Sequence, residues 1–285
     1  MKLQKNTFVL FWLLALVGFA IGQGNMVIFD ETYTIKGDNF QLDLDIDGGE
    51  VKVTKNDANN ECDVYIEYHR RKCDCDVHFN ERRNRLEIVL DHDWTSGKDK
   101  REGDSEHATV SIALPCEPKI ALDAKIKAGE IDFELGGLHL QNFELRNWAG
   151  DVTVSFDEPN RTTLQSFDVN VKIGELKMYD LGNAHFQKAD INGGIGEMTL
   201  DFRGETLKNA TAYIDLDIGE TTVIVPEGIG VKMKVSKFLF LSNVEYPNWF
   251  ERHGKYYYSE NYQENKDQLY LVISTGIGEL NVRVK

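Results

Sequence analysis

The sequence is poor in the features that several functional classes require. Among 285 residues there are only 5 Pro, 4 Cys and 5 Met, and 32 Lys and Arg stand against 47 Asp and Glu. The formal net charge is therefore −15. Binding of nucleic-acid phosphates needs a basic face, so a nucleic-acid partner is not expected. The ordinary role of so many acids is solubility, and the same charge would also attract cationic partners.

Catalytic motifs are also missing from the sequence. The seven histidines form no HExxH pattern, no serine lies in a nucleophile elbow, and no GxxxxGK[ST] loop occurs. A polysaccharide-degrading enzyme would need a placed pair of carboxylates. The residues expected to face outward show no such concentration: Lys172, Lys177, Asp190, Thr199 and Asp215. We therefore predict a protein that is not an enzyme and that needs no cofactor.

Long apolar runs are absent except at the start of the chain. Lys2 and Lys5 precede the run "TFVLFWLLALVGFA", and Ala20 and Gly22 occupy the small-residue positions of a cleavage site. The run falls short of the ~20 residues that a membrane span requires. We predict a signal peptide over 1–22, with an uncleaved anchor as the alternative. The mature chain would then have no transmembrane span and would be extracytoplasmic, either periplasmic or secreted.

Cysteine is scarce, and all four cysteines lie in the first half of the chain. Cys73 and Cys75 are two apart in a strand-like run, so they point to one face and are too far apart to bridge each other. In an exported protein we expect at least one disulfide that joins either of these two residues to either Cys62 or Cys116. The less favoured alternative is a metal site formed by "CDC" with His69 or His78.

Helical periodicity is absent, and alternation of apolar and polar residues is found throughout. "FQLDLDID" places Phe40, Leu42 and Leu44 on one face and acids on the other, and similar short runs follow. This pattern predicts an all-β protein, with an N-terminal β-strand region over 23–116.

From residue 117 onward the strands become periodic. A glycine followed by an acid recurs between alternating runs, and the acids are separated by steps of 21, 24, 22 and 23 residues: Glu130, Asp151, Glu175, Glu197 and Glu220. A fixed period of this size with strand patterning is typical of stacked coils. We predict a single-chain β-solenoid over 117–285 with coils of about 21–24 residues.

The glycine of each repeat is predicted to form a corner. Ile173 and Leu176 are three apart, so an uninterrupted strand would send them to opposite faces. A sharp turn at Gly174 and Glu175 would keep both apolar side chains inside and point the acid to water. Glycine tolerates the positive φ that such a turn requires. The predicted corners are Gly129, Gly150, Gly174, Gly196, Gly219 and Gly278.

The acids that follow these glycines are expected to form a column with one carboxylate per coil. One hypothesis is a ladder of Ca²⁺ sites along Glu130, Asp151, Glu175, Glu197 and Glu220. Since Ca²⁺ takes six to eight oxygen ligands and each corner offers one carboxylate, we favour exposed corners without a metal.

Aromatic residues gather in one segment near the C-terminus, predicted as an insertion over 240–268. The segment contains Trp249, Phe250, Tyr256, Tyr257 and Tyr258. It could bind glycans, or it could cap the open end of the solenoid, and we favour the cap. In a cap the ring of Trp249 should be mostly buried and should act as an anchor. If "YYY" is a strand, we expect Tyr256 and Tyr258 to pack inward and Tyr257 to face water.

Three stretches carry a family resemblance. "VSIALPCEPKIALDAKIKAGEIDFEL", the repeated "GIGE" junctions and the ending "YYYSENYQENKDQLYLVISTGIGELNVRV" resemble the bacterial toast-rack or "putative adhesin" family. They are also similar to the C-terminal domain of LiaF-like cell-wall stress response proteins. The resemblance implies a β-solenoid in the cell envelope without established catalytic residues.

Three functions follow from this resemblance and from the pattern. The leading hypothesis is a non-enzymatic adhesion, scaffold or interaction module whose partner is an envelope protein or a surface polysaccharide. The alternatives are an accessory protein in envelope stress sensing, and a solenoid that binds or cleaves glycans.

Overall fold

The computed structural model describes residues 20–21, 25–92, 107–237 and 242–285. Apart from one turn of 3-10 helix, η1 (Leu181–Asn183), the regular elements in these ranges are β-strands, as the alternating pattern predicts. No helix in the described ranges is long and apolar enough to cross a bilayer. Most of the predicted signal peptide lies outside them. Only its Ala20–Ile21 (β1) is described, and it pairs with β2 (Met26–Thr34).

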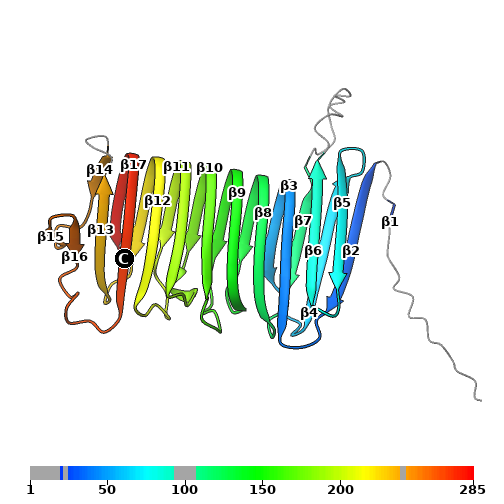
Figure 1. Cartoon of the computed structure of the whole chain (residues 1–285), viewed down its shortest axis with the longest axis horizontal. Coiled ribbons are helices and arrows are strands. Elements are labelled where there is room, and N and C mark those ends of the chain that lie inside the picture. Colours follow the sequence, from blue (N-terminus) through cyan, green and yellow to red (C-terminus); the bar gives the residue numbers. More distant parts are fainter. Residues whose placement is uncertain (1–19, 22–24, 93–106, 238–241) are drawn as a thin grey trace, which may run out of the picture.

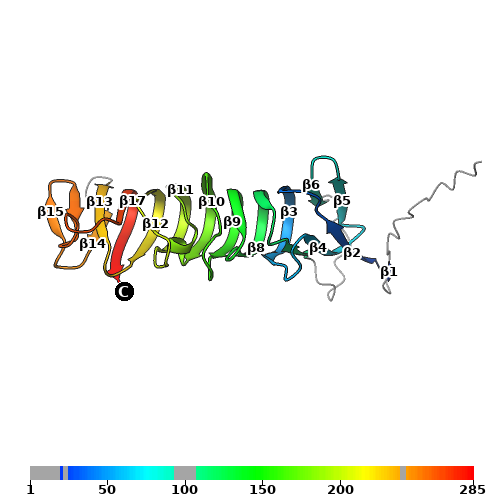
Figure 2. The ribbon, with the colours of Figure 1, turned by 90° about the horizontal axis from the view of Figure 1, so that it is seen from below.

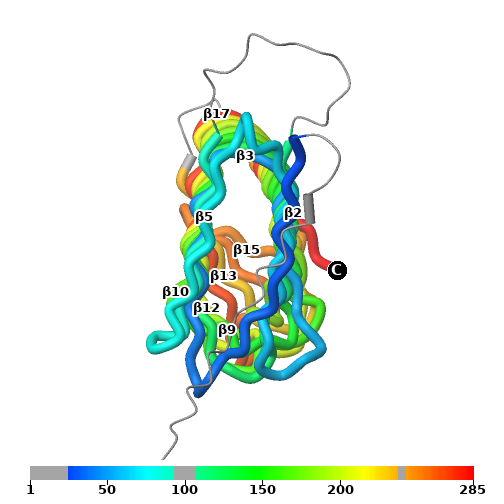
Figure 3. Tube along the Cα trace, turned by 90° about the vertical axis from the view of Figure 1, so that its right-hand side faces the viewer, coloured from blue at the N-terminus to red at the C-terminus, as the bar shows by residue number. Residues whose placement is uncertain are grey.

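Five long strands form the middle of the molecule, and each of them bends once. They are β8 (Lys119–Glu134), β9 (His139–Ser155), β10 (Ser166–Tyr179), β11 (Lys188–Asp201) and β12 (Ala210–Val225). Each pairs with the next in parallel. Viewed end on, the stack has an elongated cross-section with two facing walls (Figure 3), and from the side the strands follow one another in a row (Figure 1). The predicted β-solenoid is confirmed.

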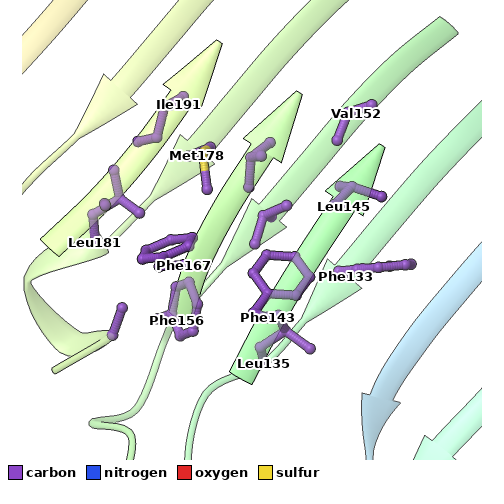
Figure 4. Close-up of a cluster of buried hydrophobic side chains, with 14 of the residues drawn as sticks. Phe133, Leu135, Phe143, Leu145, Val152, Phe156, Phe167, Met178, Leu181 and Ile191 are labelled. Atoms are coloured by element: carbon purple, nitrogen blue, oxygen red, sulfur yellow. The ribbon is translucent and has the colours of Figure 1, made fainter. Parts of the chain in front are cut away.

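The space between the two walls is filled by side chains from both halves of each strand. Phenylalanines form a continuous chain of ring contacts through the central coils (Figure 4). Phe143 and Phe167 lie 5.8 Å apart between ring centroids, Phe156 and Phe167 6.0 Å, and Phe167 and Phe186 5.6 Å. Ring pairs at this spacing add to the free energy gained by burial. The core therefore runs along the stack rather than forming separate clusters.

The N-terminal region continues the same stack. β3 (Asn39–Lys55) pairs in parallel with β8, and Gly49 lies opposite Gly129. On its other side β3 pairs in parallel with β6 (Arg85–His92) on one wall and with β7 (Thr109–Leu114) on the other. The coils thus extend through the region that the sequence assigned to a separate N-terminal part.

The two ends of the stack are built in similar ways. At the C-terminal end, β17 (Gln268–Val284) lies between β12 and an outer coil made of β13 (Gly230–Lys237) and β14 (Ser242–Glu245). That outer coil begins before the predicted insertion at 240. β3 occupies the matching inner position at the other end. At both ends, therefore, strands that are neighbours in the sheet are not consecutive in the sequence. In each case the inner strand, β17 or β3, has strand neighbours on both sides.

Antiparallel strands finish each end. β16 (Tyr256–Tyr258) pairs with β13, and β15 (Glu251–His253) pairs with β16. At the N-terminal end β5 (Cys73–Asn80) pairs with β6, while β4 (Glu61–His69) pairs with β7 and β2. Figure 2 shows both terminal hairpin regions beyond the regular coils. An exposed edge of a parallel stack could pair with a strand of another molecule. The antiparallel strands cover both edges and hinder such pairing.

Candidate functional site

The predicted corner glycines lie in register along one edge of the stack. Gly150, Gly174, Gly196 and Gly219 are paired neighbours in successive strands, and Gly219 pairs with Gly278. Gly174 has φ +131° and Gly196 has φ +147°, a region that side chains with a Cβ rarely adopt. A Cβ at Gly196 would also lie 1.8 Å from the carbonyl oxygen of Gly174. Conformation and close backbone approach both require glycine here.

The residue before each corner glycine is not buried, contrary to the prediction. Ile173, Ile195, Ile218 and Ile277 are 51%, 52%, 44% and 44% exposed, whereas Val171 and Leu176 are buried. The predicted packing of Ile173 inside the solenoid is wrong. The corner spans several residues, so the inward side chains on its two sides are Val171 and Leu176, and Ile173 is left outside. Because the strands are in register, these four residues form a stripe that we call the isoleucine ladder.

The acids after the glycines form a column beside the isoleucine ladder. Glu175 pairs with Asp151 and Glu197, and Glu220 pairs with Glu197 and Glu279. Neighbouring strands are about 4.8 Å apart, so these like charges repel each other unless they are screened. Several have partners: Lys177 Nζ lies 2.8 Å from Glu175 Oε2, and Asn281 Nδ2 donates to Glu220 Oε1 at 2.9 Å. No ion pair of Glu197 appears among the described residues.

This column carries the Ca²⁺ hypothesis, together with Glu130, which pairs with Asp151. Within the described ranges no three His, Cys, Asp or Glu side chains gather into a group that could hold a metal ion. One carboxylate per coil is too few oxygens for Ca²⁺. The acid column is therefore a line of negative charge along the edge of the stack.

A shallow groove of about 790 Å³ lies where ladder and acid column meet at the C-terminal end. Ile195 and Ile218 form its apolar part, and Glu197, Glu220 and Glu279 form its acidic part. The groove reaches β14, whose Asn243 donates to Glu279 Oε1 at 2.9 Å. It offers apolar contact and negative charge side by side, a combination suited to a partner with apolar and cationic groups.

A second column of acids, on the outer face of the other wall, was missed in the sequence. Asp43, Asp123, Glu144, Asp168 and Asp190 are in register, each six residues before a corner glycine, and this fixed offset was the available signal. Basic residues neutralise much of it: Arg85 Nε lies 2.5 Å from Asp43, and Lys188 Nζ 2.6 Å from Asp190. Burial, together with the carboxylates of Asp190 and Glu144, raises the pKa of Asp168, against the opposing effect of Arg146.

The cysteines do not form the predicted disulfide. All four are free thiols, with Cys62 on one wall and Cys73 and Cys75 on the facing wall. Packed sheets lie about 10 Å apart, which exceeds the roughly 4.4–6.8 Å between the Cα atoms of a disulfide. Cys116, in the turn before β8, lies 3.5 Å from the Asn59 side chain. Burial raises the pKa of Cys75 to about 11 and also raises the pKa values of Cys62 and Cys73, so these thiols react poorly.

The alternative metal site at "CDC" is not assembled either. His78 lies in β5 at a position whose side chain is exposed, whereas Cys73 in the same strand is buried. Residues at odd spacing along a strand point to opposite faces. His69 accepts a backbone hydrogen bond from Arg71 N at 3.3 Å. No group of metal-binding side chains forms here among the described residues.

The aromatic insertion differs from the prediction in two respects. Trp249 is 46% exposed and Phe250 only 4%, so Phe250 rather than Trp249 is the buried anchor. Tyr257 is buried, and Tyr256 and Tyr258 are half-buried on the outer face, which reverses the predicted orientation. The reason is the antiparallel pairing of β16 with β13: Tyr257 is opposite Met233, whose side chain is in the core.

Two family models match the chain and together cover most of it. Residues 25–179 match the model of the N-terminal domain of toast_rack, DUF2154, and residues 172–282 match that of the C-terminal region of LiaF, cell wall-active antibiotics response. No curated protein matches the chain.

Among solved structures, the chain has a limited similarity to two bacterial proteins. A "putative cell adhesion protein" from Clostridium sporogenes ATCC 15579 is 16% identical with a TM-score of 0.43, and the alignment covers 90% of this chain and 100% of that one. A "putative adhesin" from Bacteroides fragilis NCTC 9343 is 12% identical with a TM-score of 0.34, covering 90% and 96%.

Proposed function

The chain belongs to the toast-rack family, and we propose that it is a non-enzymatic interaction module of the cell envelope, used for adhesion or as a scaffold. The proposal places it outside the cytoplasm. Support for that location comes from the basic, apolar and small-residue pattern of the first 22 residues. A long stack of rigid coils presents a repeating surface, which is how solenoids bind extended partners.

The observation that carries the proposal is the isoleucine ladder. Four isoleucines in register, each between 44% and 52% exposed, are a costly feature for a protein that could place polar residues at a turn. Contiguous exposed apolar surface is typical of interaction sites. The equivalent residues before the glycine in other coils are Ala128 and Gly48, so the repeat itself does not need a large apolar side chain at this position. A partner is the simplest reason for the stripe.

The adjoining acids favour a partner of defined chemistry. Glu197 and Glu220 line the groove with Ile195 and Ile218, so an apolar group seated on the ladder would lie beside carboxylates. A segment with alternating apolar and basic side chains would satisfy both features. Charge complementarity of this kind governs partner choice and association rate more than total affinity.

The acid columns also support a role without catalysis. Glycosidase chemistry uses one pair of carboxylates in unlike environments, whereas here successive coils each place an Asp or a Glu at the same offset from the corner glycine. On the outer face of the other wall the acids are held by bases, as in the Arg146 ion pair with Glu144 at 2.8 Å. Such repetition is typical of a surface, and we assign no reacting pair.

A second candidate function is that of an accessory protein in envelope stress sensing. It is favoured by the LiaF-like match, because residues 172–282 include all four residues of the isoleucine ladder. In this case the ladder would contact a membrane-bound signalling partner rather than a surface polymer. Both candidates require the same edge of the stack to be a binding surface.

The test uses the purified chain and isolated bacterial envelope fragments. We expect the wild-type chain to sediment with the fragments and Ile195→Thr/Ile218→Thr to remain in the supernatant, since threonine keeps the β-branched shape but is polar. Ile195→Val/Ile218→Val is the matched control and should sediment like the wild type.

The acid column is tested in the same assay with Glu197→Gln. This variant should bind more weakly than the wild type at low salt, and the difference should shrink at high salt, where charges are screened. Sedimentation of the threonine variant at the wild-type level would contradict the proposal, provided that its thermal unfolding is unchanged.

A further inference from the structure

A different surface lies on the outer face of the wall at the C-terminal end of the stack, where β17, β13 and β16 run side by side (Figure 1). Their pairing aligns Tyr270, Lys232 and Tyr258 in one row across the three strands. In the next row Lys234 pairs with Tyr256. The residues between them along the strands, such as Met233 and Tyr257, are buried. The tyrosines and lysines therefore point outward together.

Lys232 is at the centre of this surface. Its Nζ lies 4.8 Å from the ring centroid of Tyr270, 5.1 Å from that of Tyr256 and 5.7 Å from that of Tyr258. A second lysine, Lys255, lies 5.8 Å from the centroid of the Tyr256 ring. These distances fall within the range of cation–π attraction. The rings hold the ammonium group in place between them and stay half exposed themselves.

The charge of this surface contrasts with that of the whole molecule. The protein carries a net charge of −15, yet Lys232, Lys234 and Lys255 gather here, and the carboxylate of Glu251 lies only at the margin, opposite Tyr258. Among the ion pairs between described residues, none involves any of these three lysines, while Lys52, Lys127 and Lys188 elsewhere each have a carboxylate. Aromatic rings orient an ammonium group without cancelling its charge. The positive charge here is thus fixed in position and available to an anion.

We propose that this surface binds an acidic polysaccharide through its uronic-acid units. The C–H face of a pyranose ring is apolar and packs on an aromatic ring, and tyrosine adds a hydroxyl at its edge for hydrogen bonding. Tyr270 and Tyr258 lie on strands that are two spacings, or about 10 Å, apart, with Lys232 between them. A chain laid across the strands would stack sugars on the rings and bring a carboxylate to the ammonium group, a charge-assisted hydrogen bond.

The combination of tyrosine rings and lysines favours an acidic polysaccharide over two other classes of ligand. A neutral glycan would use the rings and leave the lysines without an anion. A polyphosphate or an acyclic phosphate polymer would pair with the lysines but has no pyranose face to stack. The site lies on the wall, away from the isoleucine ladder, which is formed at the edge of the stack by Ile173, Ile195, Ile218 and Ile277. The inference therefore goes beyond the function proposed above and does not depend on it.

The test measures binding of the purified full chain to polygalacturonate by titration calorimetry. We expect the wild type to bind and Lys232→Gln to bind about tenfold more weakly, since a hydrogen bond between charged groups contributes about 1.4 kcal/mol or more. Tyr258→Leu should also weaken binding. Lys125→Gln is the matched control: Lys125 is exposed on the same wall in β8, and its loss changes the net charge equally. It should bind like the wild type.

Three results would overturn the inference: no binding of polygalacturonate by the wild type, equal binding by Lys232→Gln, or equally tight binding of inorganic polyphosphate. If Lys232→Gln fails to fold, the site is tested instead by chemical acetylation of the wild-type protein with and without polygalacturonate. Polygalacturonate should protect Lys232 from an acetylating reagent and leave Lys125 reactive, and equal reactivity would count against the site. The variant Ile195→Thr/Ile218→Thr should bind polygalacturonate normally, so a failure of the ladder proposal is distinguishable from a failure here.

Discussion

A Cβ on Gly174 would lie 1.9 Å from the carbonyl oxygen of Gly150 in the preceding coil. The same contact recurs at successive corners, where each glycine faces the backbone of the one before it, as at Gly150 and Gly129. The backbones of neighbouring corners therefore leave no room for a side chain at these glycines, although they lie at an edge of the molecule. The corner backbone holds the isoleucine ladder and the acid column at a constant spacing.

The first prediction concerns this contact. Gly174→Ala should lower the free energy of unfolding by about 2–4 kcal/mol, because it combines a strained φ with a backbone clash. Gly228 has φ +85° and nothing within 4 Å of its Cβ position, so Gly228→Ala adds backbone strain alone and should cost clearly less. Urea unfolding of both variants measures the difference, and equal losses would mean that the close approach contributes nothing.

The second prediction identifies the anchor of the C-terminal cap. Phe250 is 4% exposed, so Phe250→Ala should cost about 3–5 kcal/mol, as truncation of a buried aromatic does. Trp249 is 46% exposed, and Trp249→Ala should cost less than about half of that amount. Thermal or denaturant unfolding ranks the two variants. A larger loss for Trp249→Ala would show that the tryptophan is the anchor, as the sequence first suggested.

The third prediction is a dependence on pH. Burial and the neighbouring acids raise the pKa of Asp168 above its ordinary value of 3.8. The ionised carboxylate is thus less favourable in the folded state, and this cost is present above the folded pKa and absent below 3.8. Asp168→Asn should raise the melting temperature at pH 7, and the gain should vanish as the pH falls below about 4. A gain that persists at low pH would exclude titration as the cause.

The fourth prediction concerns the thiols. Protein unfolded without any reductant should take up four iodoacetamide groups, one on each of the four free cysteines. The folded protein should react slowly, since Cys62, Cys73 and Cys116 are buried. Mass spectrometry counts the added groups, and uptake of two or fewer by the unfolded, unreduced chain would show that a disulfide had formed.

The repeat was readable from the sequence because two signals coincide in it. Strand alternation gives the inward residues, such as Leu176 and Val171, and the step of 21–24 residues between the acids gives the stacking. Only a parallel in-register stack satisfies both. The matching corner at Gly49 and Glu50 escaped notice because β6 and β7 lie beside β3 in space but follow it in sequence, which hides the period.

The orientation of individual side chains could not be read in the same way. Alternation predicts faces only along an uninterrupted strand, so it fails at the corner, where Ile173 is exposed, and in short strands whose partner is unknown. The orientation of Tyr257 follows from its pairing with Met233, a contact between distant segments. The exposed ladder and the Tyr–Lys surface are therefore findings of the structure.

The most direct test of the central claim asks whether a partner covers the isoleucine ladder. Ile195→Cys places a thiol on the ladder. The native cysteines contribute little labelling in the folded protein, since Cys62, Cys73 and Cys116 are buried and the pKa of the half-buried Cys75 is raised to about 11. Gln165→Cys is the control, at an exposed site just before β10, and it lies eight residues, or roughly 26 Å, from the ladder position Ile173 at the bend in the middle of that strand.

Maleimide labelling rates of both variants are measured with and without isolated bacterial envelope fragments. The account predicts that the fragments slow labelling at position 195 and leave position 165 unchanged. Equal labelling of position 195 in the presence and absence of fragments would contradict it.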